Sequence, residues 1–155
     1  PATAPAPAAS AFNAAVLAEA TAKLSSVKSS ATELVIYEKI SIGNGSQANN
    51  PWLQELPDPI SKCTWDNYIL MSPNTAKANG AEHTDLNEVN RFKKVFTVKA
   101  NGAEVSLPVL VLPGMHDEVI AIAVGYGRDK MVGKAAAETG KNIYPMVSKD
   151  QWAIH

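Results

Sequence analysis

Short apolar runs separated by turn residues dominate this chain, and one helical pattern precedes them. From Phe12 to Thr32, apolar residues recur at helical spacing among Ala, Lys and Glu, which predicts one amphipathic helix. Leu34–Tyr37 is a compact apolar strand pattern, and an extension through Ile40–Ile42 is compatible with it. Val119–Val124 is almost wholly apolar, which predicts a strand buried on both faces. The pattern therefore favours a strand-rich core behind an N-terminal helix.

The clearest predicted element is a β-hairpin. Val95–Lys99 and Glu104–Leu112 both have strand composition, and they flank Asn101-Gly102. Asn-Gly is the preferred pair where a two-residue turn needs positive φ at both central positions. We therefore expect these two segments to pair as antiparallel neighbours.

Three further patterns complete the predicted fold. Ser72–Gly80 has the signals of a short helix, with a capping Ser, a Pro at the first helical position and a closing Gly. Lys134–Glu138 is compatible with a helical turn ending at Gly140, and Ile143–Val147 is interpreted as a last short strand. Strands outnumber helices and long connections join them, so the prediction is a mainly β domain with peripheral helices, closed or semi-closed as a barrel.

A dense run of proline and tryptophan, Asn50–Ser61, is the most distinctive segment of the chain. Proline fixes its own φ and restricts the preceding residue, so the run is predicted to be irregular and rigid. Large aromatic side chains in a rigid loop are expected to be buried against a ligand, this domain or a partner. Trp52 and Trp65 are predicted to be packing anchors rather than ligand contacts.

Composition and charge narrow the function classes. The net charge of -1 makes nucleic-acid binding improbable, and the apolar runs are too short for a membrane-spanning helix. Residues 1–11, rich in Pro and Ala, are interpreted as a linker. Residues 12–155 are predicted to form a single domain, with the helix at 12–32 and a barrel core at about 34–147. The whole is interpreted as a fragment of a larger chain.

Several motifs follow one another in an order that resembles a known family. They are Asn50–Ser61, Trp65–Tyr68, Ser72-Pro73, Leu107–Val109, Pro113-Gly114 and Gly125–Arg128. Together they resemble the C-terminal, molybdopterin-dinucleotide-binding-type domain of molybdopterin oxidoreductases. The likeness is greatest to the version fused to iron–sulfur modules in the large subunit of bacterial alternative complex III, a quinol:electron-acceptor oxidoreductase. It covers about Asn50 to Met146 and implies a six-stranded double-psi β-barrel.

The resemblance implies a cofactor-free scaffold that is itself non-catalytic. Cofactor-bearing relatives usually have a Gly-Asp-x-Val turn after the proline-led helix, whereas this chain has Ala81–Asn90 there. The complex III branch lacks the molybdenum cofactor, and the resemblance to it implies iron–sulfur clusters elsewhere in the full chain. The implied partners are other domains of the same chain and other subunits of a membrane respiratory complex. The implied location is the periplasmic side of a bacterial inner membrane.

The alternative is a molybdopterin guanine dinucleotide-binding domain of an active molybdenum oxidoreductase. In that case the resemblance implies dinucleotide contacts from Asn67, Gly125, Gly127, Arg128 and Asn142. The Gly125–Arg128 motif suits an anion, because glycine lets backbone N–H groups approach a phosphate and arginine supplies a fork of donors. A simple turn with a solvated arginine is the favoured interpretation of that motif. A free-standing adaptor unrelated to redox chemistry is a third, weaker hypothesis.

Other chemistry has little support in the sequence. Cys63 is the single cysteine, and an iron–sulfur cluster needs about four, so this chain alone cannot hold one. The neighbouring cation of Lys62 is compatible with an activated Cys63 thiol, but a buried, inert cysteine is favoured. His83, His116 and His155 stand far apart, so no metal site is predicted. No carboxylate pair or nucleophile with its base is visible, so no catalytic residue is assigned.

Overall fold

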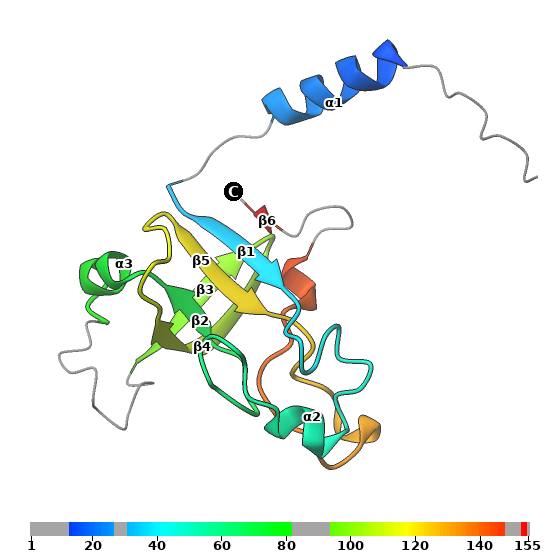
Figure 1. Cartoon of the computed structure of the whole chain (residues 1–155), viewed down its shortest axis with the longest axis vertical. Helices are drawn as coiled ribbons and strands as arrows, with labels where there is room; N and C mark the ends of the chain where they lie inside the picture. The colour runs from blue at the N-terminus through cyan, green and yellow to red at the C-terminus, as the bar shows by residue number, and fades with distance from the viewer. Residues whose placement is uncertain (1–12, 27–30, 82–93, 148–152, 155) are drawn as a thin grey trace, which may run out of the picture.

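Six strands pair into one mixed sheet in the computed structural model, which describes residues 13–26, 31–81, 94–147 and 153–154 (Figure 1). The strands lie in the order β3-β4-β2-β5-β1-β6. Their bounds are β1 Glu33–Tyr37, β2 Ile69–Met71, β3 Val95–Ala100, β4 Ala103–Val111, β5 Val119–Ala123 and β6 Ala153–Ile154. The prediction of a mainly β domain is confirmed; the double-psi barrel stays a prediction.

The centre of the sheet is built from pairings between distant parts of the chain. β5 runs parallel to β1, with Glu33 opposite Val119, and antiparallel to β2. β2 runs parallel to β4, and the short β6 runs antiparallel to β1. Parallel neighbours need long crossover connections, and this accounts for the long loops between the strands. Much of the sequence on which the family resemblance depends therefore lies in these loops.

The predicted hairpin is confirmed. β3 and β4 pair antiparallel around Asn101-Gly102, whose φ angles of 49° and 76° are both positive, as a two-residue turn requires. An ion pair of 2.9 Å joins Lys99 to Glu104, and a 2.8 Å hydrogen bond joins the Thr97 and Ser106 hydroxyls. The exposed side chains of the hairpin therefore pair across the two strands.

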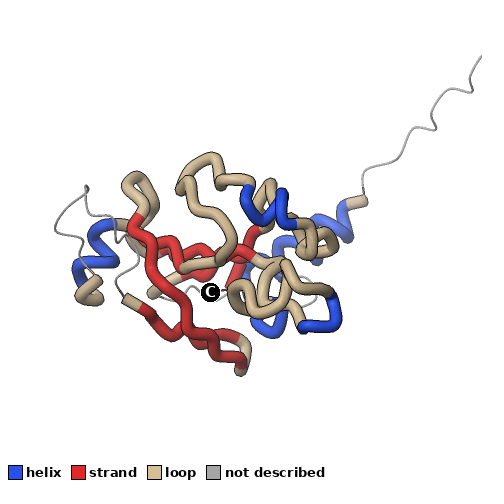
Figure 2. Tube along the Cα trace, turned by 90° about the horizontal axis from the view of Figure 1, so that it is seen from below, coloured by secondary structure: helices blue, strands red, loops and turns tan. Residues whose placement is uncertain are grey.

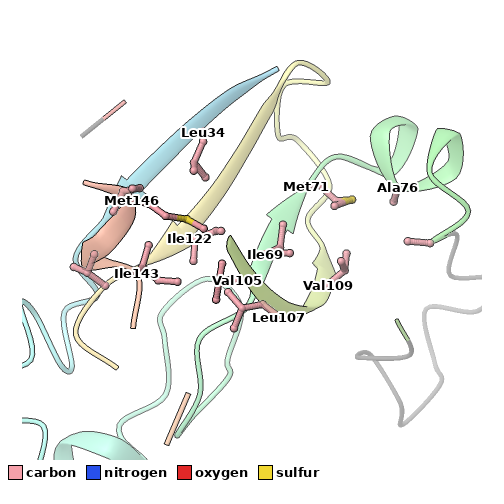
Figure 3. Packing of buried hydrophobic residues seen from close by; sticks show 13 residues of the cluster. Leu34, Ile69, Met71, Ala76, Val105, Leu107, Val109, Ile122, Ile143 and Met146 are labelled. Carbon is pink, nitrogen blue, oxygen red and sulfur yellow. The ribbon is translucent and has the colours of Figure 1, made fainter. Parts of the chain in front are cut away.

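Alternation of side chains along the strands produces the main core. Ile69, Leu107 and Ile122 are fully buried there, together with Ile143 and Met146 from the segment after the last long loop (Figure 3). Along β5, Ile122 contributes to this cluster, while Ala121 and Ala123 contribute to two smaller ones. The prediction that this strand is buried on both faces is confirmed.

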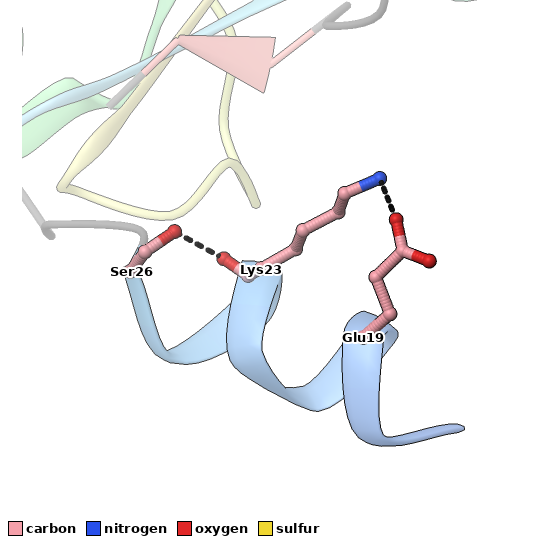
Figure 4. A network of polar contacts seen from close by, with 3 residues as sticks. All are labelled: Glu19, Lys23 and Ser26. Carbon is pink, nitrogen blue, oxygen red and sulfur yellow. Dashed lines mark hydrogen bonds and ion pairs between the residues drawn. The ribbon is translucent and has the colours of Figure 1, made fainter. Parts of the chain in front are cut away.

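Short helices lie at the periphery of the strands (Figure 2). They are α1 Ala14–Ser26, α2 Pro51–Glu55, α3 Pro73–Ala78 and the 3-10 helices η1 Lys130–Val132 and η2 Tyr144–Met146. α1 buries none of its residues, and a 2.9 Å ion pair between Glu19 and Lys23 lies on its exposed surface (Figure 4). It is shorter than the predicted helix, because Thr32 lies in a bend; Phe12 and residues 27–30 lie outside the described residues.

α3 confirms the prediction for Ser72–Gly80. The buried Ser72 caps the helix by accepting a hydrogen bond from the Thr75 amide, and Pro73 occupies the first turn. Ser72 also donates to the Asp117 carboxylate at 2.5 Å, and Asn74 donates to the same carboxylate at 3.0 Å. These bonds hold the pKa of Asp117 below its usual value. They attach α3 to the connection between β4 and β5.

Two local predictions are wrong. Ile143–Val147 is not a strand but contains η2, because Pro145 has no N–H for a strand ladder while the Met146 and Val147 amides close tight turns. Ile40–Ile42 forms turns rather than an extension of β1, since the Gly43 amide bonds back to the Lys39 carbonyl at 2.8 Å. The helical turn predicted at Lys134–Glu138 is present as a single turn, closed by the Ala137 amide on the Gly133 carbonyl at 3.1 Å.

Two strands were not predicted, β2 and β6. β2 has three residues, all buried, and follows directly on the aromatic motif Trp65–Tyr68. No helix among the described residues has the length and apolarity needed to cross a membrane. The segment Ala81–Asn90, which separates this chain from cofactor-bearing relatives, lies outside the described residues from position 82 onward. The division into a linker and a single domain stays a prediction.

Candidate functional site

The residues expected to contact a dinucleotide gather where the loops after β5 and before β2 meet. Asn67 comes from the segment before β2, Gly125, Gly127 and Arg128 follow β5, and Asn142 lies in the next loop. Gly127, Arg128 and Asn142 line an open hollow of about 490 Å³, together with Asp129, Lys130, Glu138, Gly140 and Lys141. The structure therefore brings these sequence-predicted residues together.

Asn67 is fully buried and serves as an internal connector. Its side-chain amide donates to the carbonyls of Ala123 at 3.0 Å and Lys141 at 2.9 Å. Its side-chain oxygen accepts from the Lys141 amide at 2.9 Å. Both ends of the carboxamide are thus occupied by backbone groups of this chain, and the side chain joins the end of β5 to the loop that carries Asn142.

The two glycines permit close approach of the backbone to other parts of this chain. Gly125 has φ of 95°, and a Cβ there would collide with the Gly43 carbonyl oxygen. Gly127 has φ of 68°, and a Cβ there would collide with the backbone nitrogen of Asn142. Glycine tolerates both the positive φ and the missing space. The positive φ and small size of these glycines could let backbone N–H groups approach a phosphate, but here they let loops of this chain approach each other.

Arg128 is half-buried and reaches across the loops. Its Nη2 donates to the Asn44 carbonyl at 2.8 Å, and the Tyr144 hydroxyl donates to the same carbonyl at 2.7 Å. The guanidinium carbon lies 5.8 Å from the Tyr144 ring centroid, within the range of a cation–π contact. Its Nε is buried and has no partner among the described residues. Arg128 is therefore largely engaged inside the chain but retains unused hydrogen-bonding capacity.

Asn142 and the charged residues define the rim of the hollow. The Asn142 side chain is exposed and accepts from the Tyr144 amide at 3.1 Å. Lys130 and Glu138 form an exposed ion pair of 2.6 Å. The hollow therefore has basic groups, but one of them is already neutralised by a neighbouring carboxylate.

The Pro/Trp run is less irregular than predicted. Asn50 is extended, with φ of -85° and ψ of 109°, and its side chain caps α2 by accepting from the Trp52 amide at 3.0 Å. Gln54 is buried and donates to the Ala48 carbonyl at 2.9 Å. Asp58 then accepts from the Ile60 and Ser61 amides at 3.0 and 2.8 Å. A short helix and a capped turn therefore fix this run.

The predicted role of Trp52 as a packing anchor is wrong for the described part of this chain. Its side chain is 82% exposed, and Ile60, in the same run, is 72% exposed. The reason is local: Asn50 and Pro51 fix the start of α2, and the inward face of that one-turn helix is occupied by Gln54 and the half-buried Leu53. Trp65 is half-buried, with φ of 66°, and its amide bonds to the Gln54 carbonyl at 2.8 Å.

Lys39 forms a buried cluster that the sequence did not reveal. It is 4% exposed, and it is the one buried charged residue in the described ranges. Its Nζ donates to the Asp66 carbonyl at 2.8 Å and lies 4.1 Å from the Tyr68 ring centroid and 5.1 Å from that of Tyr126. No ion pair to Lys39 is found in the part of the chain that the structure describes. The aromatic faces and one carbonyl therefore stabilise the ammonium.

Burial dominates the protonation chemistry of this cluster. It lowers the pKa of Lys39 to about 8, although the nearby charges of Asp58 and Asp66 act in the opposite direction. Burial raises the pKa of Tyr126 to about 12 and raises the pKa values of Tyr37 and Tyr68 as well. None of the tyrosines is therefore activated as a proton donor at neutral pH.

The cluster attaches the Pro/Trp run to the sheet. The Ser61 hydroxyl bonds to the Tyr68 hydroxyl and, at 2.9 Å, to the Asp58 carboxylate. Partial burial opposes ionisation of Asp58, but the hydrogen bonds from Ser61 and Ile60 outweigh it and hold its pKa below the usual range. A signal that could have indicated this cluster is the spacing of Lys39, Tyr68 and Tyr126 at the ends of three buried strands.

The remaining candidates bring no chemistry together. Cys63 is half-buried, and its thiol donates to the Ser61 carbonyl at 3.6 Å. His116 accepts a hydrogen bond from the Glu118 amide at 3.2 Å, whereas His83 and His155 lie outside the described residues. Within the described ranges no group of His, Cys, Asp and Glu side chains could hold a metal ion.

Comparison with known proteins adds no relative: no protein-family model matches the chain, and no curated protein matches it. The resemblance to molybdopterin oxidoreductases therefore depends on the sequence motifs. The site geometry is the remaining guide to function.

Proposed function

We propose that this chain is a cofactor-free, non-catalytic module of the molybdopterin-oxidoreductase type, with a double-psi barrel as its fold. Its role is to scaffold an iron–sulfur electron-transfer subunit of a quinol-oxidising respiratory complex. One observation supports this most: the residues that would contact a dinucleotide direct most of their polar groups at this chain. Asn67 in particular is fully buried, and both ends of its side chain bond to backbone groups.

A scaffold needs rigid surfaces that present apolar side chains. The Pro/Trp run is held by the Asn50 cap, the Asp58 turn and the Ser61–Tyr68 bond, yet it leaves Trp52 and Ile60 exposed. Tryptophan is enriched among the residues that contribute most to protein–protein binding. The proposed partners are neighbouring domains of the same chain and other subunits of the complex, at the periplasmic side of a bacterial inner membrane.

The test is to analyse the protein as it is isolated from its native source. Mass spectrometry after denaturation should find no released pterin or guanine nucleotide, while iron is found only with the rest of the complex. Pterin or nucleotide in stoichiometric amount would overturn the proposal. A protein of similar size with a known bound nucleotide, carried through the same extraction, shows that release and detection are efficient.

The alternative function, binding of molybdopterin guanine dinucleotide, is favoured by the hollow of about 490 Å³ beside Arg128. Arg128 and Lys141 both line this hollow, and their basic side chains suit a phosphate. Calorimetric titration with guanosine diphosphate distinguishes the two functions. The scaffold predicts no saturable heat; the alternative predicts saturable binding that is lost in Arg128→Ala and kept in Lys62→Ala, which lies outside the hollow.

A further inference from the structure

Among the described strands β3 is an edge of the sheet, and its outward backbone groups can be identified from its pairing with β4. The Val109 amide bonds to the Lys94 carbonyl at 2.9 Å, and Phe96 and Val98 lie opposite Leu107 and Val105. Backbone groups alternate in direction along an antiparallel strand. Lys94, Phe96 and Val98 therefore direct theirs at β4, while Val95, Thr97 and Lys99 direct theirs away from the sheet.

The two faces of β3 differ in character. Val95, Thr97 and Lys99 have exposed side chains. Phe96 and Val98 are half-buried and pack against the main core. Because strands at an edge expose their backbone groups and half of their apolar side chains, such an edge is a template for another strand. Covering it would complete the burial of Phe96 and Val98.

Natural edge strands usually carry a feature that prevents pairing, such as proline, a bulge or an unpaired lysine. In β3 the lysine is Lys99, and its charge is paired with Glu104 of the same hairpin at 2.9 Å. The proline, Pro108, lies on β4 opposite Val95 and so leaves the β3 backbone intact. The described structure thus contains no strong obstacle to pairing along this edge.

We propose that the β3 edge pairs antiparallel with β3 of a second copy of this chain, about a two-fold axis at Thr97. Each copy then contributes the outward groups of Val95, Thr97 and Lys99, which allows about six hydrogen bonds. Phe96 lies beside Val98 of the second copy, and aromatic and β-branched residues form favourable cross-strand pairs. The two six-stranded sheets become one continuous sheet.

The charge pattern of β3 is compatible with a second copy as its partner. At this two-fold axis Lys99 faces Val95 of the other copy, and Thr97 faces its own equivalent, so no like charges lie opposite each other. The same residues supply both sides, as an isologous interface requires. This inference is independent of the proposed function, since it uses neither the hollow nor the Pro/Trp run.

Sedimentation equilibrium over a range of protein concentrations tests the proposal. The unaltered chain should show a monomer–dimer equilibrium, and Thr97→Lys should weaken association by about tenfold or more, because two ammonium groups then face each other at the axis. Ser106→Lys is the matched control: it adds the same charge and removes the same Thr97–Ser106 bond. In the dimer the two positions 106 lie about 14 Å apart, so the repulsion is screened.

A purely monomeric unaltered chain would overturn the proposal, as would a dimer that Thr97→Lys leaves unchanged. Circular dichroism and thermal unfolding establish that both lysine variants fold. A second measurement locates the interface: in a Cys63→Ser background, Thr97→Cys should form an intermolecular disulfide under mild oxidation, because opposed residues lie at a suitable distance. Ser106→Cys should not. Equal cross-linking of the two would contradict pairing along β3.

Discussion

The hollow beside Arg128 and the Pro/Trp run show opposite relations between residue type and exposure. Asn67 is polar and was expected to meet a ligand under the alternative function, yet it is fully buried. Trp52 is aromatic and was expected to be buried, yet it is 82% exposed. In both places hydrogen bonds to the backbone decide which way the chain turns. A capped helix start orients Trp52 outward, and two connecting loops enclose Asn67.

The difference teaches that the polar residues hold this end of the molecule together. Asn67 joins two separate backbone segments through the hydrogen bonds of its side chain, as strand pairing does elsewhere in the fold. Trp52 contributes its large area to no described neighbour. Removing the polar side chain should therefore cost far more stability than removing the aromatic one, which reverses the usual expectation for core energetics.

The largest effect is expected for Asn67→Ala. It removes three hydrogen bonds, including the buried one to the Ala123 carbonyl, so we expect a loss of about 3 kcal/mol in the free energy of unfolding. Urea unfolding measures it. The control Asn142→Ala, at an exposed position in the same site, should cost less than about 1 kcal/mol. Equal losses would contradict the special role of Asn67.

A slightly smaller effect is expected for Gly127→Ala. The new Cβ meets the Asn142 backbone at a residue with positive φ, so we expect a loss of about 2 kcal/mol or more. Gly102→Ala is the matched control, because its φ of 76° is similar but nothing lies within 4 Å of its Cβ. It should lose only about 1 kcal/mol. Thermal or urea unfolding gives the free energy of unfolding of both variants. The difference between them separates the cost of the contact between loops from the cost of the positive φ.

The third prediction concerns pH. Between the folded pKa of Lys39, about 8, and its unfolded value of 10.5, the unfolded chain binds a proton that the folded chain does not. Stability should therefore rise with pH from about 8, by about 1 to 2 kcal/mol before the tyrosines titrate. Above pH 10 it should fall again, because the folded tyrosines have raised pKa values and the unfolded ones ionise first.

Urea unfolding at a series of pH values measures this dependence, with Lys39→Met as the control. Met has a similar length and no charge, so the rise above pH 8 should disappear in the variant while the fall above pH 10 remains. A rise that persists without Lys39 would show that another group produces it. Such a result would show that the titration of Lys39 does not set the pH dependence of stability.

The smallest effect is expected for Trp52→Ser. An 82% exposed side chain contributes little to folding, so the free energy of unfolding should change by less than about 0.5 kcal/mol. Leu53→Ser, at the next position, removes a side chain that packs against the cluster around Ile42 and Tyr126 and should cost about 1 to 2 kcal/mol. A larger loss for Trp52 than for Leu53 would show that the aromatic ring is packed in solution.

Local patterns predicted the elements that local forces decide. The Asn101-Gly102 hairpin, the capped helix after Ser72 and the two apolar strands β1 and β5 all follow from turn chemistry, capping and alternation. β2 escaped prediction because three apolar residues between an aromatic motif and a helix cap are too few to show a period. Ile143–Val147 resembled a strand by composition, but Pro145 excludes a regular ladder.

The sequence predicted which residues form the site, but it did not predict what each of them does there. The resemblance named Asn67, Gly125, Gly127, Arg128 and Asn142, and the structure brings them together. What the sequence cannot express is that most of these residues meet backbone from a distant part of the chain, as Arg128 meets Asn44. The Lys39 cluster escaped prediction for the same reason, since Lys39, Tyr68 and Tyr126 come from three separate segments.

The parallel pairing of β1 with β5 has a consequence for the order of folding. Glu33 can meet Val119 only after the intervening chain has been brought together, and closing such a large loop is slow. The β3–β4 hairpin is closed by a two-residue turn and can form within microseconds. We therefore expect the hairpin to form early and the joining of β1 to the sheet to limit the refolding rate.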